Sequence, residues 1–232
     1  MAEIPTRRRF LGTAATVATV GVAGCLDGDS GSDGGSEDEA AVALADHPLG
    51  EDLDQWPHLG PDPFEAPATL VVLDDPSCPT CARFHRNTIT ELESSYVADG
   101  ELALAVRPYP VVYPWGEPAA HVLEATVPRE EAVFWDLLEH YFAEQDAFDD
   151  DNVLDRTETW LAENTDLDAA AVIDDADSEP ATSRIEATLS AGEEAGAGSV
   201  TPATFAFVDG TLRTSLNGSV STNTVETALE LG

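Results

Sequence analysis

Hydrophobic and polar positions first predict a strand, a helix and a second strand. Residues 68–73 form an almost unbroken apolar run, which predicts a buried strand. From residue 78 to about 97, apolar residues recur every three or four positions, as on one face of a helix. Residues 102–106 predict the next strand. This order predicts a parallel, right-handed βαβ unit.

The segments on either side of this unit have different patterns. Residues 46–67 are rich in Pro, Gly and Asp and predict an irregular lead-in that packs against the core. Residues 117–176 have helical spacing and predict a helical insertion, with helices over 130–145 and 152–164. A further helix is expected to run without a break from residue 173 to 191.

The last part of the chain predicts a hairpin and a closing helix. A Thr201-Pro202 pair precedes the β-rich run 203–208, and the Asp209-Gly210 pair that follows is a strong signal for a hairpin turn. Residues 221–231 then return to helical spacing. Strands and helices in this order indicate an α/β fold.

The most informative motif is Cys78-Pro79-Thr80-Cys81, which follows the first predicted strand. Cys78 falls where the predicted helix begins, and a helix N-terminus stabilises a thiolate through its free N–H groups and its dipole. Cys81 lies one turn further along, where it can resolve a mixed disulfide. The motif therefore predicts thiol–disulfide exchange.

Two other roles are possible for such a motif. It is half of a zinc site, but tetrahedral zinc takes four ligands, and the only other cysteine is Cys25. Two soft thiolates also suit copper, so a thioredoxin-like protein that handles copper or another soft metal is the alternative function. That alternative predicts a nearby Met or His ligand, and Met1 is the only methionine.

The order of strand, C-P-x-C motif, helical segment, Thr-Pro pair, hairpin and helix resembles the thioredoxin superfamily. Within it, the chain is similar to the DsbA-like thiol–disulfide oxidoreductases over roughly residues 66–231, including a Phe134-Trp135 helix. The resemblance implies a thioredoxin-like fold whose βαβ half and C-terminal ββα half are separated by an insertion at about 117–176. It also implies that the activity needs no cofactor beyond the dithiol.

The same resemblance implies the site residues. Cys78 would be the nucleophile and Cys81 the resolving thiol, with Pro79 and Thr80 as the motif dipeptide. Pro202 would be a cis-proline that faces the dithiol, and Thr201 would offer backbone hydrogen bonds to the substrate.

The chain departs from the family pattern at two positions. Many members have an acid six residues before the first cysteine, which helps to move the proton of the resolving thiol, and this chain has Val72 there. Asp74 or Asp75 either takes over that role or is an exposed acid. His85, on the predicted helix, either faces the dithiol or is exposed. The strongest oxidants have His where this chain has Thr80, whose hydroxyl could donate one hydrogen bond to the Cys78 sulfur. We therefore expect a less acidic thiol and a milder oxidant.

The N-terminal residues predict an export signal rather than a part of the folded domain. Residues 6–11, Thr-Arg-Arg-Arg-Phe-Leu, match a twin-arginine export signal, and the apolar run after them is too short for a good transmembrane helix. Residues 1–24 are therefore a predicted signal peptide that ends in a lipoprotein-type box. Cys25 is the predicted lipid anchor, residues 25–45 a flexible acidic tether, and residues 46–232 the folded domain.

The charge limits the possible partners. The formal net charge is −35, and every one of the ten basic residues is an arginine. The chain has no basic patch for nucleic acid, so DNA or RNA binding is excluded as a function. Such acidity resembles proteins of extreme halophiles, in which molar salt screens self-repulsion. The fold is therefore expected to weaken at low salt.

These patterns predict an extracytoplasmic thiol–disulfide oxidoreductase, held on the outer face of the membrane by Cys25. Its substrates would be exported proteins with thiols or disulfides, and a membrane redox partner would recycle it. The sequence leaves open whether it acts as an oxidase, a reductase or an isomerase. No appended dimerisation segment is evident, so a monomer is expected. No nucleotide-binding glycine motif is present, so the dithiol itself would carry the electrons.

Overall fold

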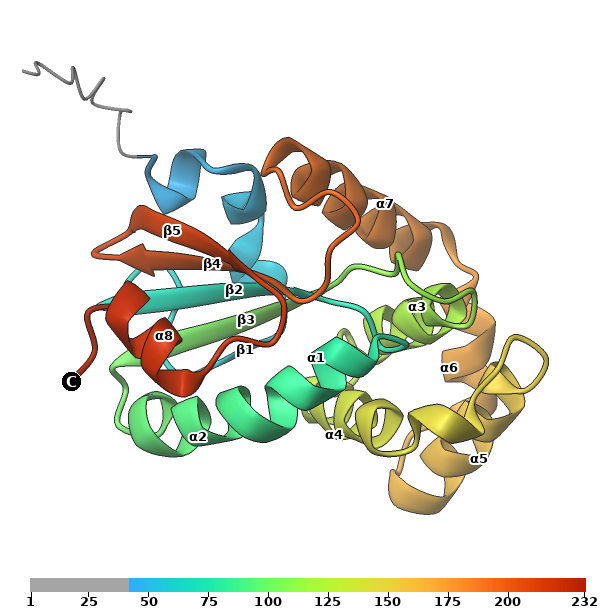
Figure 1. The fold of residues 1–232 in the computed structure, drawn as a ribbon. Coiled ribbons are helices and arrows are strands. Elements are labelled where there is room, and N and C mark those ends of the chain that lie inside the picture. The colour runs from blue at the N-terminus through green and yellow to red at the C-terminus, as the bar shows by residue number, and fades with distance from the viewer. Residues whose placement is uncertain (1–41) are drawn as a thin grey trace, which may run out of the picture. The chain divides into compact units, whose positions relative to one another are not determined.

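A mixed five-stranded sheet forms the centre of the computed structural model, which describes residues 42–232 (Figure 1). The sheet order is β1-β3-β2-β4-β5, in which β2 and β3 are parallel and the other neighbours are antiparallel. The predicted parallel βαβ unit and the C-terminal hairpin are therefore confirmed. The strands are β1 (His58–Leu59), β2 (Ala68–Asp74), β3 (Leu102–Pro108), β4 (Ala203–Val208) and β5 (Thr211–Asn217).

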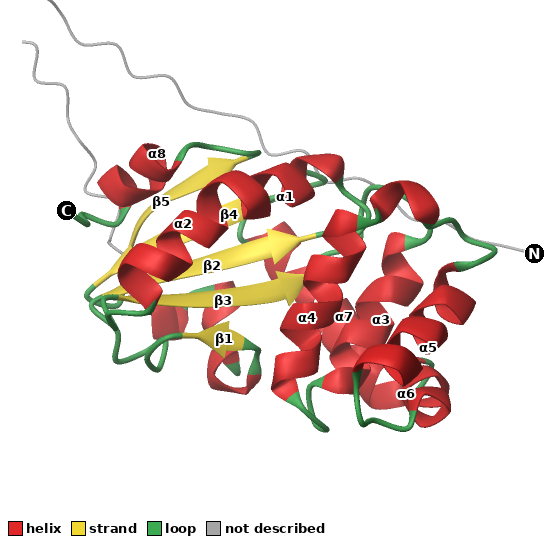
Figure 2. Cartoon of the chain, turned by 90° about the horizontal axis from the view of Figure 1, so that it is seen from below, coloured by secondary structure: helices red, strands yellow, loops and turns green. Residues whose placement is uncertain are grey.

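The three central strands are buried on both faces, which explains their nearly continuous apolar sequences. Leu70 and Val72 of β2 enter one hydrophobic cluster, and Val71 and Leu73 enter the cluster on the opposite face. Figure 2 shows the helices that follow Cys78, together with the C-terminal helix, lying across the first of these faces. The two faces of β2 therefore meet different parts of the chain.

The helix after Cys78 contains two wide turns. It comprises α1 (Pro79–Phe84), a π-helical turn at His85–Ile89, α2 (Thr90–Leu92) and a second π-helical turn at Glu93–Val97. The prediction of a helix to about residue 97 is confirmed, and two π-helical turns, at His85–Ile89 and Glu93–Val97, interrupt its α-helical period. In the first wide turn, the Thr90 hydroxyl donates a 3.1 Å hydrogen bond to the His85 carbonyl. Such turns are frequent at functional sites.

Between β3 and β4 the chain is helical. The elements are α3 (Gly116–Thr126), α4 (Glu131–Ala143), α5 (Val153–Asn164), α6 (Ala169–Ala176) and α7 (Glu179–Glu194), with a 3-10 turn at Gln145–Ala147. The helices α3 to α6 lie beyond one end of the sheet, where the predicted insertion is found (Figure 1). The unbroken helix predicted over 173–191 was wrong. Pro180 stands in the first turn of α7, and a proline is tolerated there but not inside a helix.

The second face of the sheet is covered by α7 and the lead-in. The lead-in contains 3-10 turns at Leu44–Asp46, Pro48–Gly50 and Leu53–Gln55. Trp56 is buried, and the guanidinium carbons of Arg107 and Arg184 lie 4.2 and 4.1 Å from its ring centre. This arrangement fixes the lead-in against both β3 and α7.

The C-terminal elements close the sheet. Asp209 and Gly210 both have positive φ, 49° and 69°, which suits a tight hairpin turn between β4 and β5. Helix α8 (Thr222–Ala228) begins after Ser221, whose side chain caps it, and it buries Val225.

The described residues correct one predicted boundary. The tether was expected to continue to residue 45, but Ala43 pairs with Thr211 and Leu44 is 1% exposed. The folded part therefore includes residues 43–45. The predicted signal peptide and the predicted anchor Cys25 lie outside the described residues. Within residues 42–232, no helix has both the length and the apolar character needed to cross a membrane.

Candidate active site

The two motif cysteines lie at the start of α1, just after the end of β2. Cys78 is the N-cap residue, and its sulfur accepts a hydrogen bond from the backbone N–H of Cys81 at 3.4 Å. Pro79 occupies the first turn, where its missing N–H costs nothing. Both cysteines are free thiols, with 4% of Cys78 exposed and none of Cys81. Cys78 is thus the only one of the two that a partner can reach.

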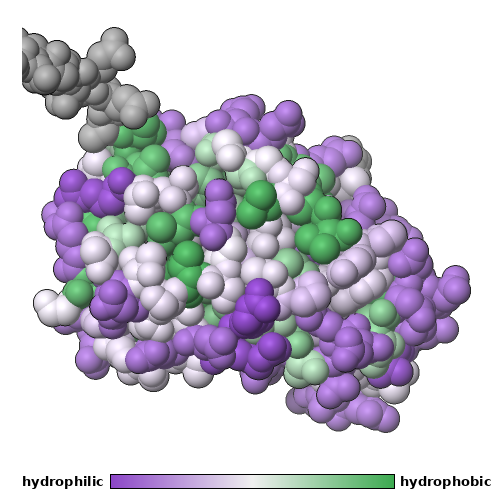
Figure 3. Space-filling view, viewed as in Figure 1, coloured by the Kyte–Doolittle hydropathy of each residue, from purple (hydrophilic) through white to green (hydrophobic). Residues whose placement is uncertain are grey.

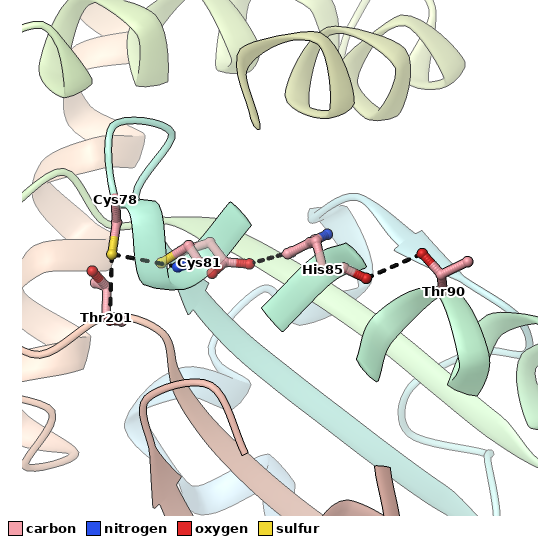
Figure 4. A network of polar contacts seen from close by, with 6 residues as sticks. Cys78, Cys81, His85, Thr90 and Thr201 are labelled. Carbon is pink, nitrogen blue, oxygen red and sulfur yellow. Dashed lines mark hydrogen bonds and ion pairs between the residues drawn. The ribbon is translucent and has the colours of Figure 1, made fainter. Parts of the chain in front are cut away.

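The loop before β4 brings Thr201 and Pro202 against Cys78. Their peptide bond is cis, which is the isomer that the family resemblance implies. The Cys78 thiol donates to the Thr201 carbonyl, with 3.5 Å between sulfur and oxygen, across 123 positions of sequence (Figure 4). The Thr201 hydroxyl is buried and, in the described part of the chain, makes no hydrogen bond of ordinary length, but it lies close enough to Cys78 to lower the pKa of its thiol. The four predicted catalytic residues therefore lie together.

The site shifts the pKa values of the two cysteines in opposite directions. The pKa of Cys78 is lowered to about 6, chiefly because the Cys81 thiol donates to its sulfur. The Thr201 side chain and the backbone N–H groups of Cys81 and Thr80 also lower it, while burial opposes them. Burial, the hydrogen bond to Cys78 and the negative charge of Asp74 raise the pKa of Cys81. Of the two, Cys78 is therefore the thiol that ionises readily, and Cys81 stays protonated.

Thr80 acts differently from the expectation. Its hydroxyl accepts a hydrogen bond from Arg83 at 3.3 Å, so the side chain turns along the helix. Only its backbone N–H stabilises the Cys78 thiolate. The expected hydrogen bond from the Thr80 hydroxyl to the sulfur is therefore absent from the site.

Asp75 anchors the loop that carries Cys78. Its buried carboxylate accepts hydrogen bonds from the backbone N–H and the hydroxyl of Ser77, at 2.8 and 2.6 Å. It also accepts from the N–H groups of Val111 and Val112, at 2.8 and 2.7 Å. Burial raises the pKa of Asp75, although these four donors act in the opposite direction. The carboxylate therefore ties the active-site loop to the segment after β3.

Asp74 is also buried rather than exposed. It is 0% exposed, and its Oδ2 lies 2.6 Å from Nε2 of His85. Of the sequence alternatives, an exposed acid is wrong for both Asp74 and Asp75. The sequence shows only two adjacent acids. In the fold, neighbouring residues at a strand end point to opposite faces, so the two carboxylates meet different partners.

Comparisons with known proteins agree with this arrangement. The model of the family described as Thioredoxin matches residues 58–229. This chain belongs to the thioredoxin family. No curated protein matches the chain.

Solved structures of DsbA-type proteins share the fold of this thioredoxin-family chain. For alpha-DsbA1 of Wolbachia pipientis the TM-score is 0.64 at 17% identity, over 75% of this chain and 89% of that one. For oxidised BdbD of Bacillus subtilis it is 0.64 at 19% identity, over 77% and 95%. For DsbA of Chlamydia trachomatis it is 0.60 at 17% identity, over 75% and 88%. The predicted DsbA-like thioredoxin fold with a helical insertion is therefore confirmed.

A shallow groove of about 410 Å³ lies beside the dithiol of this thioredoxin-family protein. Pro79, Tyr113, Trp115 and Phe148 line it. Tyr113 is 52% exposed, whereas Trp115 belongs to the hydrophobic core as well as to the lining of the groove. Figure 3 shows apolar patches on the face viewed, among mainly hydrophilic residues. Ser77 and Pro79, the residues on either side of Cys78, belong to its lining, so the groove adjoins the motif.

Protein metal sites are built from several His, Cys, Asp or Glu side chains that converge on one point. Within 42–232, no group of three or more His, Cys, Asp or Glu side chains is placed to hold a metal ion.

Proposed function

We propose that this protein is an extracytoplasmic thiol–disulfide oxidoreductase that exchanges disulfides with exported proteins. One observation carries the proposal: two adjacent buried thiols have pKa values shifted apart, and the acidic one, Cys78, is the one that keeps a small exposed area, 4%. A pair of groups whose environments separate their pKa values has divided roles in catalysis. The dithiol holds the electrons, so no further cofactor is part of the proposal.

The exchange has two steps in either direction. When the protein donates its disulfide, a substrate thiolate attacks the Cys78 sulfur and Cys81 leaves with the electron pair of the broken S–S bond. A second substrate thiolate then attacks the substrate sulfur of the mixed disulfide and expels the Cys78 thiolate. The substrate is oxidised and the protein is reduced by two electrons. A Cys78 pKa of about 6 makes that thiolate a good leaving group.

The acidity of Cys78 supports a moderate oxidant. Its pKa of about 6 lies nearer to that of thioredoxin, about 7, than to that of DsbA, about 3.5. A less stabilised thiolate means a less stabilised reduced form, and therefore a weaker tendency to donate a disulfide. We expect a reduction potential between those of the two proteins, about −270 and about −120 mV. Equilibration with glutathione mixtures in molar KCl, followed by counting free thiols, measures it.

The proposed location follows from the N-terminal motifs. A signal over residues 1–24 and lipidation of Cys25 would place the domain on the outer face of the membrane, on an acidic tether. A membrane protein would then recycle the dithiol, and the protein itself would act as a monomer. Mass spectrometry of the protein from its host tests the anchor, because an intact or unlipidated N-terminus contradicts it.

The exchange itself is tested by trapping the mixed disulfide. Cys81→Ser removes the resolving thiol, so substrate proteins should remain covalently attached to Cys78. A non-reducing gel of the exported proteins then shows mixed disulfides that disappear on reduction. Cys78→Ser is the matched control, since it keeps one buried thiol and should trap almost nothing. Equal trapping by both variants, or trapping by neither, would contradict the proposed function.

A further inference from the structure

Three carboxylates line the groove beside the dithiol. They belong to Asp146, Asp149 and Asp150, which are exposed and lie in the segment between α4 and α5. Among the residues that the structure describes, no basic side chain lines this groove, and none of the three acids takes part in an ion pair. Uncompensated negative charge is therefore concentrated next to Cys78, where a partner of opposite charge can neutralise it.

The rest of the groove lining is largely apolar. Tyr113 is half-exposed, and its ring and that of Pro79 offer apolar surface between the motif and the segment after β3. A long basic side chain needs such a surface for its stem and a polar place for its charged head. An aromatic ring also attracts a cation directly. Arg156 shows this at Phe148, with its guanidinium carbon 5.3 Å from the ring centre, although Arg156 itself lines a different hollow.

Both sides of the groove are fixed to the loop that carries Cys78. On one side, the side-chain amide of Gln145 donates a 2.9 Å hydrogen bond to the Pro76 carbonyl. On the other side, the backbone N–H of Tyr113 donates a 3.1 Å hydrogen bond to the Ser77 hydroxyl. A groove that is already ordered loses little entropy when a partner binds. The carboxylates are therefore held in place relative to the reactive sulfur.

A second hollow continues the groove away from the motif. It has a volume of about 400 Å³ and shares Gln145 and Asp146 with the groove. Glu144 adds a further carboxylate there. The one basic residue that lines this second hollow is Arg86, which donates to the Phe142 carbonyl at 3.5 Å. Two connected hollows of the same charge suit an extended basic segment better than a single small molecule.

We propose that this groove selects substrate segments that carry lysine or arginine beside the reactive cysteine, and that Asp146 and Asp150 are the specificity-determining residues. The inference rests on the proposed exchange function and names the substrate class of the same site. When the substrate cysteine meets Cys78, a neighbouring basic side chain lies across Tyr113 and places its head among the carboxylates. Acidic segments are repelled at the same place.

Asp149 lines the groove as well, but it has a second role. Its carboxylate accepts the backbone N–H of Asp151 at 3.0 Å, so its removal would also disturb the local backbone. No hydrogen bond to the side chains of Asp146 or Asp150 is present within residues 42–232. These two acids can therefore be changed without loss of a structural contact.

The test uses the Cys81→Ser variant, which stops at the mixed disulfide. Synthetic peptides carry one cysteine, capped as a disulfide with a coloured aromatic thiol, and differ only in the flanking residues, which are Lys, Gln or Glu. The Cys78 thiolate attacks the peptide sulfur, a Cys78–peptide disulfide forms, and the aromatic thiolate leaves with the electron pair of the broken bond. Colour release is followed in molar KCl, where the Debye length is about 3 Å and only charges in contact matter. Each rate is divided by that of the same peptide with glutathione, which removes its intrinsic reactivity.

We expect the Lys peptide to react at least roughly threefold faster than the Gln peptide, since one exposed ion pair changes an equilibrium by up to about fivefold. The Glu peptide should be the slowest. Asp146→Asn combined with Asp150→Asn should abolish the preference for Lys over Gln. The matched control is Glu65→Gln combined with Asp99→Asn, which removes the same charge from exposed residues. These two precede the parallel strands β2 and β3, at the end away from Cys78, so the preference should remain.

Equal rates for the Lys and Gln peptides would overturn the proposed specificity, and so would a preference that survives the loss of Asp146 and Asp150. A preference lost equally in the control variant would also overturn it, because the net charge would then be the cause. Asp150→Arg gives an independent answer, since it should favour the Glu peptide, and an unchanged order contradicts the proposal. If no peptide forms a disulfide with Cys78 while glutathione reacts normally, the exchange function itself is wrong.

Discussion

The low pKa of Cys78 makes the stability of the reduced protein depend on pH. The perturbation is Cys78→Ala, which removes the ionising group and keeps Cys81. The folded pKa of Cys78 is about 6, against an ordinary value of 9.0. A thiol with a depressed folded pKa stabilises the fold fully above its unfolded pKa, and this contribution is lost as pH falls through the folded pKa.

The magnitude follows from these two values. With about 1.36 kcal/mol for each unit of pKa, the thiolate contributes close to nothing at about pH 5, about 1.4 kcal/mol at pH 7 and about 2.7 kcal/mol at pH 8. Cys81 adds no pH dependence in this window, because its raised pKa keeps it a thiol in the folded state and it is still a thiol when unfolded. The expected signature is a stability difference between wild type and variant that grows with pH.

Urea unfolding of both reduced proteins in molar KCl, at three pH values between about 5 and 8, measures this difference. The pH dependence of alkylation provides a second readout, because only the thiolate reacts. Its midpoint should lie near 6. A stability difference that stays constant from about pH 5 to 8, together with an alkylation midpoint above about 8, would refute the reasoning.

Three further predictions concern the same site and the charged surface. Thr201→Val removes a hydroxyl that lowers the pKa of Cys78, so the alkylation midpoint should rise, and an unchanged midpoint contradicts this role. Gly116→Ala would place a methyl group 2.5 Å from Oδ1 of Asp75; it should cost about 1–3 kcal/mol in urea unfolding, as overpacking does, and slow attack by Cys78. Transfer from molar KCl to dilute buffer should lower the melting temperature by at least roughly 5 °C, because unscreened repulsion acts on a chain of net charge −35; equal melting temperatures would exclude this effect.

Local sequence determined the parts that depend on periodicity and turn chemistry. The apolar runs predicted β2 and β3 because a strand that is covered on both faces needs no polar positions. Asp209 and Gly210 predicted their hairpin because both residues tolerate the positive φ of a tight turn. The cysteine pair predicted an exchange site because a helix start favours a thiolate.

Tertiary packing decided what periodicity does not encode. The helix after Cys78 contains two π-helical turns, which the spacing of its apolar residues does not predict. Ala43 and Leu44 join the domain because they meet Thr211 and Gly210, which are distant in sequence. A local pattern cannot reveal a partner that lies more than a hundred residues away.

The difference between what the sequence determines and what the fold determines is clearest at Asp74 and Asp75. The sequence presents two adjacent acids without a difference between them. The end of β2 turns one towards His85 and the dithiol helix, and the other towards the backbone after β3. The alternation of a strand separates the two side chains, and the elements packed on each face then give one a titratable partner and the other four fixed donors. The residue types were therefore set by the sequence, and their separate roles by the fold.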